Sequence, residues 1–304
     1  MPQNVLRTTS GGIAMRLGTW RAPDGPRVVA LVMDKWLDIC ALLSGDVRGR
    51  DLSALIRDWS ALSRTIEDGA RRAAAGELAL IAADETALAA PLPQPRRILC
   101  IGHNYREHVA EQKAELPAAP EVFIRLASTL CGPRDPILLP RETPQVDYEA
   151  ELCVVIGQGG RRIAKEQALS AVFGWTVLDD VSVRSYQYRG KQWTPGKNFP
   201  GTAPCGPYVV TRDELPDPQM LDVSCVLSGE RMQHGSTADM IFDVASIIAD
   251  VSVFTALEPG DLIATGTPPG VGMARRPQRW LRAGDQVECS VSKVGTIANV
   301  CVLD

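Results

Sequence analysis

The sequence predicts a mainly β protein of the α+β class, built as a sandwich or rolled barrel. Many short runs of apolar and β-branched residues are separated by turns containing glycine or proline, whereas helical periodicity is confined to a few segments. The apolar run 152–156 ends at Gly157, as expected of a strand that enters a core. With 304 residues, 45% of them hydrophobic, the chain is long enough for two unequal domains.

The N-terminal third is expected to form a small α/β domain over residues 15–90. Residues 1–14 are polar and contain a Gly-Gly pair, which predicts a flexible extension. Short strands are expected over residues 15–20, 27–33 and 36–39, and the apolar spacing of residues 51–75 predicts one helix. The alternating prolines of residues 91–96 predict an extended linker, so a second domain would span residues 97–304.

The second domain is predicted to contain mostly strands. Strands are expected at residues 98–102, 122–126, 152–156, 176–181, 221–227, 262–264, 286–291 and 296–303. Helices are expected at residues 104–113, 165–173 and 240–257. Residues 185–207 show no clear period and predict a long loop, and loops of that length within a compact domain are usually functional.

Composition excludes several classes of protein. The net charge is −4, and no Lys/Arg cluster with interleaved aromatic residues occurs, so we expect no nucleic-acid partner. No apolar run reaches membrane-spanning length, and the N-terminus lacks a secretory core, so we expect no membrane partner and a cytoplasmic location. The eight cysteines form no C-x-x-C pair, which predicts reduced core residues.

The strongest chemical signal is the acidic segment that precedes the apolar run. Asp147, Glu149 and Glu151 alternate, and alternate residues of a strand share one face. Three like charges on one face favour a bound hard cation such as Mg²⁺, Mn²⁺ or Ca²⁺, although a solvated strand end is an equal alternative. Asp180 would add a carboxylate if its strand lies alongside, and would otherwise be a turn former.

Three further segments are chemical candidates. His108 precedes Glu111 by three residues, so on a helix Glu111 could orient His108 as a general base, although an exposed helix pair is the commoner case. Lys197 lies in the long loop and could meet an anion or simply be solvated. The glycine-rich residues 265–272 could offer backbone N–H groups to a carboxylate, or form a structural turn.

In their order along the chain, these segments resemble the fumarylacetoacetate hydrolase family from about Arg97 to the C-terminus. The matching segments are Gly102-His103-Asn104-Tyr105 with His108 and Glu111, residues 147–152, residues 180–184, residues 196–199 with Gly206-Pro207, Gln233 with residues 237–242, and residues 260–272. The resemblance implies a mixed β-sandwich roll with a small N-terminal domain, usually assembled as a homodimer.

The resemblance also implies an enzyme and its site. It assigns Mg²⁺ or Mn²⁺ to Glu149, Glu151 and Asp180, and a catalytic dyad to His108 and Glu111 on a lid segment. It assigns Lys197 to an enolate or oxyanion. Substrate contacts are expected from Arg125, Tyr148, Arg184, Gln187, Gln233 and Thr267.

Some residues depart from the family pattern, and the reaction stays open. Asp179 stands where the family often has asparagine, Arg125 where it usually has lysine, and Pro200 where it often has aspartate; Asp147 is not a usual ligand. We expect hydrolysis of a C–C bond in an acylpyruvate-like 2-oxo acid, through a metal-stabilised enolate and water activated by the dyad. Decarboxylation or isomerisation of a 2-oxo dicarboxylate, such as oxaloacetate or an intermediate of aromatic catabolism, is the alternative. A non-catalytic binding protein is disfavoured because every expected site residue is present.

Overall fold

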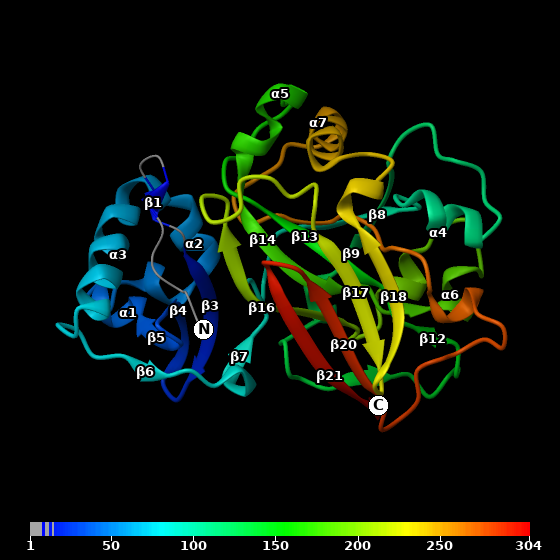
Figure 1. Cartoon of the computed structure of the whole chain (residues 1–304), viewed down its shortest axis with the longest axis horizontal. Helices are drawn as coiled ribbons and strands as arrows, with labels where there is room; N and C mark the ends of the chain where they lie inside the picture. Colours follow the sequence, from blue (N-terminus) through cyan, green and yellow to red (C-terminus); the bar gives the residue numbers. More distant parts are fainter. Residues whose placement is uncertain (1–7, 10–11, 14) are drawn as a thin grey trace.

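The computed structural model describes residues 8–9, 12–13 and 15–304 (Figure 1). The predicted extension over residues 1–14 therefore lies mostly outside the described residues. Within it, β1 (Thr8–Thr9) pairs with β2 (Gly12–Ile13).

A twelve-stranded mixed sheet forms the centre of the molecule. Its strands are β3 (Arg16–Ala22), β4 (Gly25–Val32), β5 (Lys35–Asp38), β6 (Ile81–Ala82), β7 (Leu88–Ala89), β8 (Ile98–Gly102), β9 (Glu121–Arg125), β10 (Leu130–Cys131), β13 (Ala150–Ile156), β14 (Val172–Asp179), β16 (Ala203–Thr211) and β19 (Leu262–Ala264). The order along the sheet is β6-β5-β4-β3-β16-β14-β13-β19-β8-β9, with β10 beside β16 and β7 beside β3.

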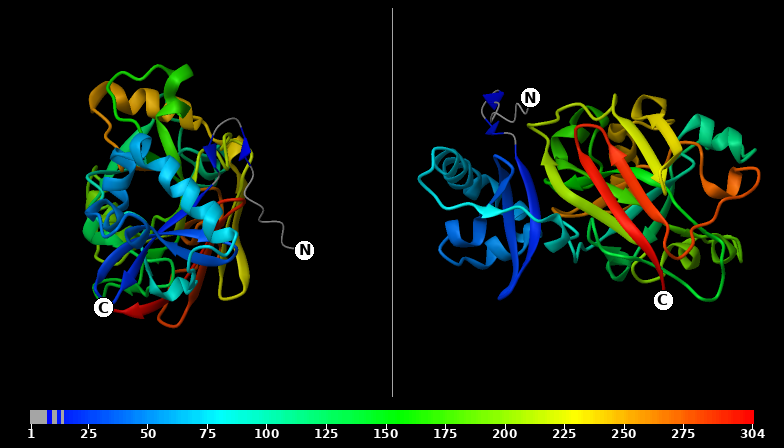
Figure 2. Two further views of the ribbon diagram at one scale, coloured as in Figure 1. Left: turned by 90° about the vertical axis from the view of Figure 1, so that its left-hand side faces the viewer. Right: turned by 60° about the horizontal axis from the view of Figure 1, so that its bottom comes forward.

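This sheet crosses the boundary that the prolines predicted. Leu17 of β3 pairs with Val209 of β16, so strands of the N-terminal unit continue directly into those of the C-terminal unit. One hydrophobic core contains residues of both units, including Leu55 of the N-terminal part and Val155 of β13. The helices α1–α3 cover β3–β5 at one end of the molecule (Figure 2). The N-terminal unit therefore has the predicted α/β character, but it does not have a sheet of its own.

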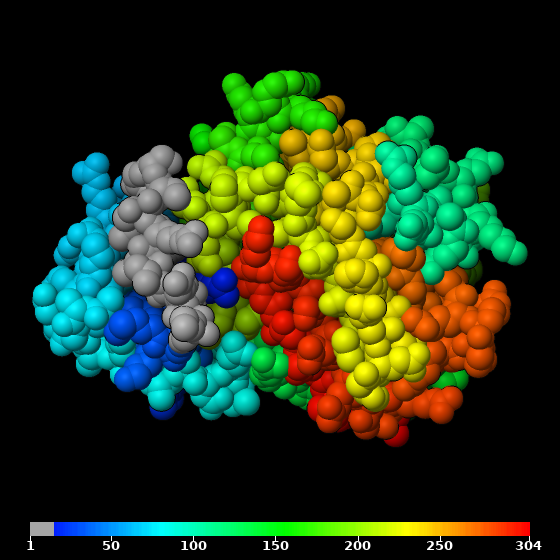
Figure 3. Space-filling model, viewed as in Figure 1, coloured from blue at the N-terminus to red at the C-terminus, as the bar shows by residue number. Residues whose placement is uncertain are grey.

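A five-stranded sheet packs on the central one and completes the predicted sandwich (Figure 1). Its strands, in spatial order, are β11 (Ile137–Leu139), β21 (Gly295–Leu303), β20 (Gln286–Val291), β17 (Asp222–Leu227) and β18 (Glu230–Ser236). β20, β21, β17 and β18 form much of the face seen in Figure 3. The two remaining strands, β12 (Val146–Asp147) and β15 (Ser182–Val183), pair with each other.

β13 is buried on both faces, which explains its unbroken apolar run. Leu152 and Val154 point into the core shared with the five-stranded sheet, whereas Cys153 and Val155 point into the core shared with the N-terminal helices. A strand covered on both sides needs apolar residues at every position, so it lacks the polar alternation of a surface strand. All eight cysteines are free thiols and seven are buried, as the sequence predicts.

The helices are shorter than the sequence predicts. They are α1 (Ile39–Leu42), α2 (Leu52–Arg57), α3 (Trp59–Ala74), α4 (Arg106–Glu111), α5 (Lys165–Ala168), α6 (Arg184–Gln187) and α7 (Val244–Phe254). Short 3₁₀ turns are η1 (Val47–Arg50), η2 (Glu85–Ala87), η3 (Ala127–Thr129), η4 (Leu169–Ala171), η5 (Thr194–Lys197), η6 (Thr237–Asp239) and η7 (Gly272–Ala274). None of the helices in the described part of the chain has the length and apolarity of a membrane span.

Two helix predictions need correction. The single helix expected over residues 51–75 is broken at Asp58, whose backbone angles of −103° and 16° are not helical. The helix expected from residue 240 begins at Val244, because η6 occupies residues 237–239 and Asp243 acts as the N-cap. The long loop expected over residues 185–207 is interrupted by α6, by η5 and by the start of β16.

The Asp243 cap should make the stability of α7 depend on pH. Asp243 Oδ1 accepts from the backbone N–H of Ser246 at 2.7 Å. Burial would raise the pKa of Asp243, but its hydrogen bonds with Lys165 and Ser246 outweigh burial and lower it. Because the folded pKa is depressed, the stabilisation is present above the unfolded value of 3.8 and is lost as the pH falls through the folded value.

We therefore expect Asp243→Ala to lower the free energy of unfolding by about 1 kcal/mol at pH 7, as loss of an N-cap usually does. Asp243→Asn is the matched control, because asparagine caps as well as aspartate but does not titrate. Thermal unfolding at pH 7 and near pH 3 measures both effects. Equal midpoints of Asp243→Ala and the parent at pH 7 would contradict the assigned cap.

Candidate active site

Three carboxylates converge where β13 and β14 lie side by side. Glu151 pairs with Leu178 in the antiparallel register, and the backbone N–H of Asp180 donates to the carbonyl of Glu149 at 2.9 Å. Residues that face each other across paired strands, or alternate along one strand, share a face of the sheet. The side chains of Glu149, Glu151 and Asp180 are buried, and each has a carboxylate oxygen within 4.8 Å of the others. The strand pairing that the sequence left open therefore brings the three predicted ligands together.

Asp147 does not join this cluster, so the prediction that three alternating acids share one face was wrong for it. The chain leaves β12 after Asp147 and enters β13 only at Ala150. The buried carboxylate of Asp147 accepts from the backbone N–H of Gly272 at 2.7 Å and from Arg184 at 2.8 Å. Asp147 therefore holds a loop and an arginine in place.

Two buried cations that line the pocket neutralise part of the carboxylate cluster. Lys197 Nζ lies 2.8 Å from Glu149 Oε2 and 2.6 Å from Asp180 Oδ2, and Arg184 Nη2 lies 2.6 Å from Glu149 Oε1. Burial alone would raise the pKa of Glu149, but Lys197 and Arg184 outweigh it and lower the pKa below its ordinary range. Burial also acts to lower the pKa of Lys197, but Asp180 and Glu149 raise it overall.

Glu151 is the carboxylate that has no ion pair among the described residues. Burial, followed by the charges of Asp180 and Glu149, raises its pKa well above the usual value. Oxygen ligands of this kind are what Mg²⁺ and Mn²⁺ bind in proteins, and a divalent cation would supply the charge that Glu151 lacks. The three carboxylates therefore fit a hard divalent metal ion.

Arg125 lies behind the cluster, not in the space that a substrate would enter. Its guanidinium contacts the Asp180 carboxylate, and Nη2 donates to both the carbonyl and the hydroxyl oxygen of Thr202 at 2.8 Å. The side chain of Arg125 is fully buried. This geometry does not support the expected contact between Arg125 and substrate, and instead shows the residue orienting Asp180.

Asp179 occupies the position where the resemblance leads one to expect asparagine. Its carboxyl accepts from the backbone N–H of Glu149 at 2.8 Å. Burial raises the pKa of Asp179 to about 7, so this carboxyl is only partly ionised near neutral pH. In its neutral form Asp179 adds no charge to the cluster, and in this respect it resembles the asparagine expected at this position.

His108 and Glu111 form a hydrogen-bonded pair on α4. His108 Nδ1 lies 2.7 Å from Glu111 Oε1, and the other oxygen of Glu111 accepts from the backbone N–H of Gly270 at 2.9 Å. Both side chains are largely buried, so this is not an exposed helix pair. Because a carboxylate only accepts hydrogen bonds, His108 carries its proton on Nδ1, so Nε2 is an acceptor, and the amide nitrogen of Gln112 lies 2.7 Å from it.

The glycine-rich loop 265–272 binds carboxylates of the protein itself. The backbone N–H groups of Gly266 and Gly270 donate to Glu151 and Glu111, at 2.8 and 2.9 Å, and that of Gly272 donates to Asp147. The sequence predicted that this turn offers N–H groups to a carboxylate. The donors are present, but their partners are a predicted metal ligand, the dyad glutamate and the Asp147 anchor.

Thr267 lies in the same loop and lines the pocket. Its hydroxyl donates to the carbonyl of Ala150 at 2.9 Å and accepts from Gln233 Nε2 at 2.8 Å. The hydroxyl proton is thus already used within the protein. Gln233 and Tyr148, two further expected substrate contacts, are buried behind the pocket wall; Tyr148 donates to the carbonyl of Gly270.

Gly270→Ala is expected to damage both stability and activity. Gly270 has a φ of +107°, and an added Cβ would lie 2.1 Å from the carbonyl oxygen of Met232. The loop must shift, which costs about 1–3 kcal/mol of stability and withdraws the N–H that holds Glu111. Gly284→Ala is the matched control, because Gly284 has a φ of +88° and open space around it. Comparable losses in both variants would show that backbone strain alone is responsible.

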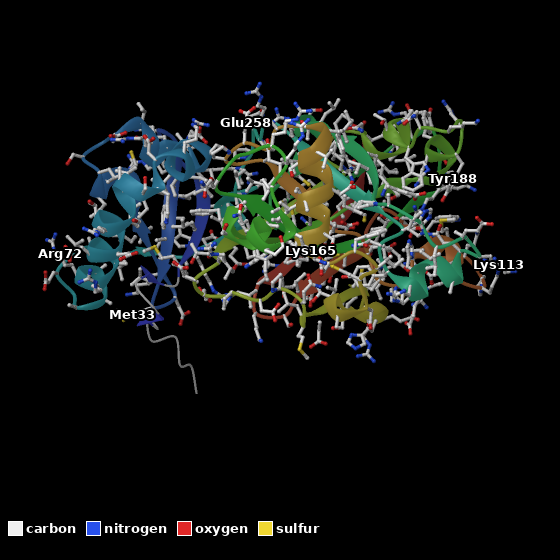
Figure 4. The ribbon with its side chains drawn as sticks, turned by 90° about the horizontal axis from the view of Figure 1, so that it is seen from above. Met33, Arg72, Lys113, Lys165, Tyr188 and Glu258 are labelled. Carbon is white, nitrogen blue, oxygen red and sulfur yellow. The ribbon has the colours of Figure 1, made fainter. Side chains whose placement is uncertain are left out.

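A pocket opens onto the carboxylate cluster. It lies at the end of the molecule opposite the N-terminal unit, and Figure 4 shows Tyr188, which lines it, far from Arg72. The lining residues are Ile101, Gly102, His103, His108, Gln112, Phe123, Glu149, Glu151, Asp180, Arg184, Gln187, Tyr188, Trp193, Lys197 and Thr267.

Several lining residues were not predicted from the sequence. Gln112 lies four residues after His108, and that helical spacing could have indicated a shared face. Phe123 and Trp193 pack edge-to-face at 5.6 Å and form an aromatic wall. Trp193 and Tyr188 come from the irregular segment between α6 and η5, where no periodic signal exists.

Residues 97–302 match the family model described as fumarylacetoacetate (FAA) hydrolase C-terminal. The chain is 44% identical over 234 residues to a mitochondrial oxaloacetate tautomerase of Rattus norvegicus, covering 77% of this chain and 75% of that protein. It is 40% identical over 257 residues to 2,4-didehydro-3-deoxy-L-rhamnonate hydrolase of Sphingomonas sp. (strain SKA58), covering 84% and 89%.

A solved structure extends the similarity to almost the whole chain. Maleylpyruvate hydrolase from Sphingobium sp. SYK-6, in complex with manganese(II) ion and pyruvate, superposes with a TM-score of 0.78 at 32% identity. The match covers 95% of this chain and 99% of that one. The similarity therefore includes the N-terminal unit as well as the part of the chain that carries the pocket.

Proposed function

Because the chain belongs to the fumarylacetoacetate hydrolase family, whose members compared above are enzymes, we propose that it acts on a small 2-oxo acid with the help of a bound Mg²⁺ or Mn²⁺. The favoured reaction is hydrolysis of a C–C bond in an acylpyruvate-like substrate. The observation that carries this proposal is the buried set Glu149, Glu151 and Asp180 on the same pocket as His108.

The charges around the pocket favour an anionic substrate. With Asp179 in its neutral form, four buried carboxylates face three buried cations, which leaves a charge of −1; these groups are Asp147, Glu149, Glu151, Asp180, Arg125, Arg184 and Lys197. A divalent cation would change this charge to +1. One substrate carboxylate would then neutralise the site, and buried charge is costly unless it is neutralised.

Each residue has a distinct role in the proposed reaction. Glu149, Glu151 and Asp180 would hold the divalent ion, which would supply positive charge to oxygens of the substrate. Lys197 adds positive charge at the same place, held between Glu149 and Asp180. Glu111 keeps the proton of His108 on Nδ1, so that Nε2 can take a proton from water once the amide of Gln112, 2.7 Å away, turns aside. Arg184 contacts Glu149, and its Nη1 donates a hydrogen bond to Oε1 of Gln187 at 2.9 Å, which positions the guanidinium.

The alternative reaction is tautomerisation or decarboxylation of oxaloacetate in the same pocket. The similarity to a relative named oxaloacetate tautomerase supports it as strongly as the named hydrolases support hydrolysis. Both reactions pass through an enolate, and only hydrolysis needs an attacking water. The fold does not distinguish them.

The test is a comparison of substrates with the metal-stripped protein, before and after addition of Mg²⁺ or Mn²⁺. Acetylpyruvate, fumarylpyruvate, oxaloacetate and an unsaturated 2-oxo dicarboxylate form the panel, with loss of enol absorbance and product identification as readouts. A new carboxylic acid supports hydrolysis, whereas enol–keto exchange or CO₂ release from oxaloacetate alone supports the alternative. Turnover that does not depend on metal would reject the proposal. The homodimer and the cytoplasmic location expected from the sequence remain proposals.

A further inference from the structure

A second histidine shares the pocket wall with the proposed base. The rings of His103 and His108 have their centroids 6.3 Å apart, and the amide of Gln112 lies between them. Gln112 Nε2 lies 2.7 Å from His108 Nε2, and Gln112 Oε1 lies 3.3 Å from His103 Nε2. All three side chains line the pocket, yet the dyad described above assigns no role to His103 or Gln112.

The opposite nitrogen of each ring is held by a carboxylate. His103 Nδ1 lies 2.6 Å from Glu121 Oε2, and His108 Nδ1 lies 2.7 Å from Glu111 Oε1. The pairing of β8 with β9 places Glu121 opposite Gly102 and so beside His103. Since an ionised carboxylate only accepts, each ring carries a proton on Nδ1, and only the two Nε2 atoms can vary.

The amide limits how those two atoms can be protonated. It offers one accepting oxygen and one donating NH₂ group, whereas an imidazole Nε2 accepts in the neutral ring and donates in the imidazolium. Whichever way the amide is turned, one ring must donate to it and the other must accept from it. Both hydrogen bonds are therefore made only when one histidine is charged and the other is neutral.

We propose that Gln112 makes His103 and His108 share a single positive charge, with His103 as the resting imidazolium and His108 as the neutral base. This inference rests on the proposed function, because it assigns Gln112 and His103 as positioning residues for the same base. When the Gln112 amide turns away from His108 Nε2, that nitrogen can take a proton from water; His103 then releases its Nε2 proton to solvent, and completing the half-turn of the amide restores both bonds. The charge of the pair stays constant through that exchange.

The surroundings of His103 suit this role. Its side chain is 18% exposed and that of Glu121 is 47% exposed, which gives the proton a path to solvent. His103 has a φ of +52°, a conformation that is strained for a residue with a side chain, and strain of this kind concentrates at functional sites. Its ring packs edge-on against Trp193 at 5.1 Å. The ionisable groups facing the two rings are Glu111, Glu121, Glu149, Glu151, Asp180, Arg184, Tyr188 and Lys197.

Nitrogen NMR of the full-length, Mg²⁺-loaded protein labelled with ¹⁵N-histidine tests the proposal without substrate. The chain has three histidines, so single variants assign every signal, and the exposed His234 serves as the internal reference. At pH 7 we expect three protons on the four ring nitrogens of His103 and His108. Gln112→Glu places two acceptors between the rings and should raise the count to four. A count that stays at three in Gln112→Glu would overturn the proposal.

The kinetic readout uses the same variants on whichever panel substrate is turned over. Gln112→Glu should lower kcat at pH 7 at least tenfold and move the acidic limb of the rate profile to higher pH, with little change in KM. Gln112→Met keeps the length of the side chain but cannot hydrogen-bond to the two rings, so it should break the coupling between the two histidines. In that background, His103→Asn should no longer change the protonation of the His108 ring. An unchanged rate profile in both Gln112 variants would also overturn the proposal. If no panel substrate is turned over but three ring protons are counted, the proposed function is rejected whereas charge sharing between the histidines is supported.

Discussion

Glu151→Gln is expected to weaken Mg²⁺ binding and to reduce metal-dependent turnover by about a thousandfold. A metal ion contributes several kcal/mol to such a reaction, and each 1.4 kcal/mol corresponds to a factor of ten. Glutamine has almost the same shape as glutamate, so Gly266 can still donate to the side-chain oxygen that it now holds at 2.8 Å. What the substitution removes is the negative charge that no cation pairs among the described residues.

Titration calorimetry with Mg²⁺, followed by rate measurements, would check this expectation. Glu166→Gln is the matched control, because the same change of charge is made on an exposed side chain of α5. Thermal unfolding in the absence of metal separates loss of the site from loss of the fold. If Glu151→Gln bound Mg²⁺ as tightly as the parent, the assignment of the metal ligands would be wrong.

His108→Ala should lower turnover by about 10² to 10⁴ while leaving the affinity for Mg²⁺ nearly unchanged. The lost group is the general base, and His108 makes no hydrogen bond to Glu149, Glu151 or Asp180 in the described structure. The effect should therefore fall on kcat and not on metal binding. Rates at saturating substrate and metal, measured beside calorimetry, distinguish the two.

His234→Ala is the control for this variant, since His234 is an exposed residue of β18. Glu111→Gln should cause a smaller loss than His108→Ala, because it keeps the base but weakens its orientation. A parent-like kcat for His108→Ala on the true substrate would remove His108 from the mechanism. Equal losses of kcat and of Mg²⁺ affinity would instead show that the substitution disrupts the metal site.

The elements that could be predicted from the sequence are those whose signal is local. Strand periodicity and turn residues predicted most strands, and the apolar run of β13 predicted a strand that enters a core, which the structure shows to be buried on both faces. Residues 51–75 were correctly predicted as helical, but the break at Asp58 was missed, because one non-helical residue leaves the apolar spacing on either side intact. The proline-rich segment predicted a linker, but it could not reveal that β3 and β16 join the two units into one sheet.

For the site, the alternation of Glu149 and Glu151 predicted a shared face, whereas the contribution of Asp180 depended on a strand pairing that only the fold provides. The same reasoning failed for Asp147, because a strand that ends between two acids sends their side chains in different directions. Arg125 shows the other limit: sequence resemblance placed it at the substrate, while the packing turned it towards Asp180.

The sequence by itself determined the chemical character of this protein: a mainly β chain with an acidic strand, a His-Glu pair on a short helix and a glycine-rich loop, in an order typical of one enzyme family. The tertiary structure alone decided which groups meet. Strand register and the path of the loop 265–272 depend on contacts between residues far apart in the chain. Such contacts are set by packing and by the need to pair buried charges, and no local pattern encodes them.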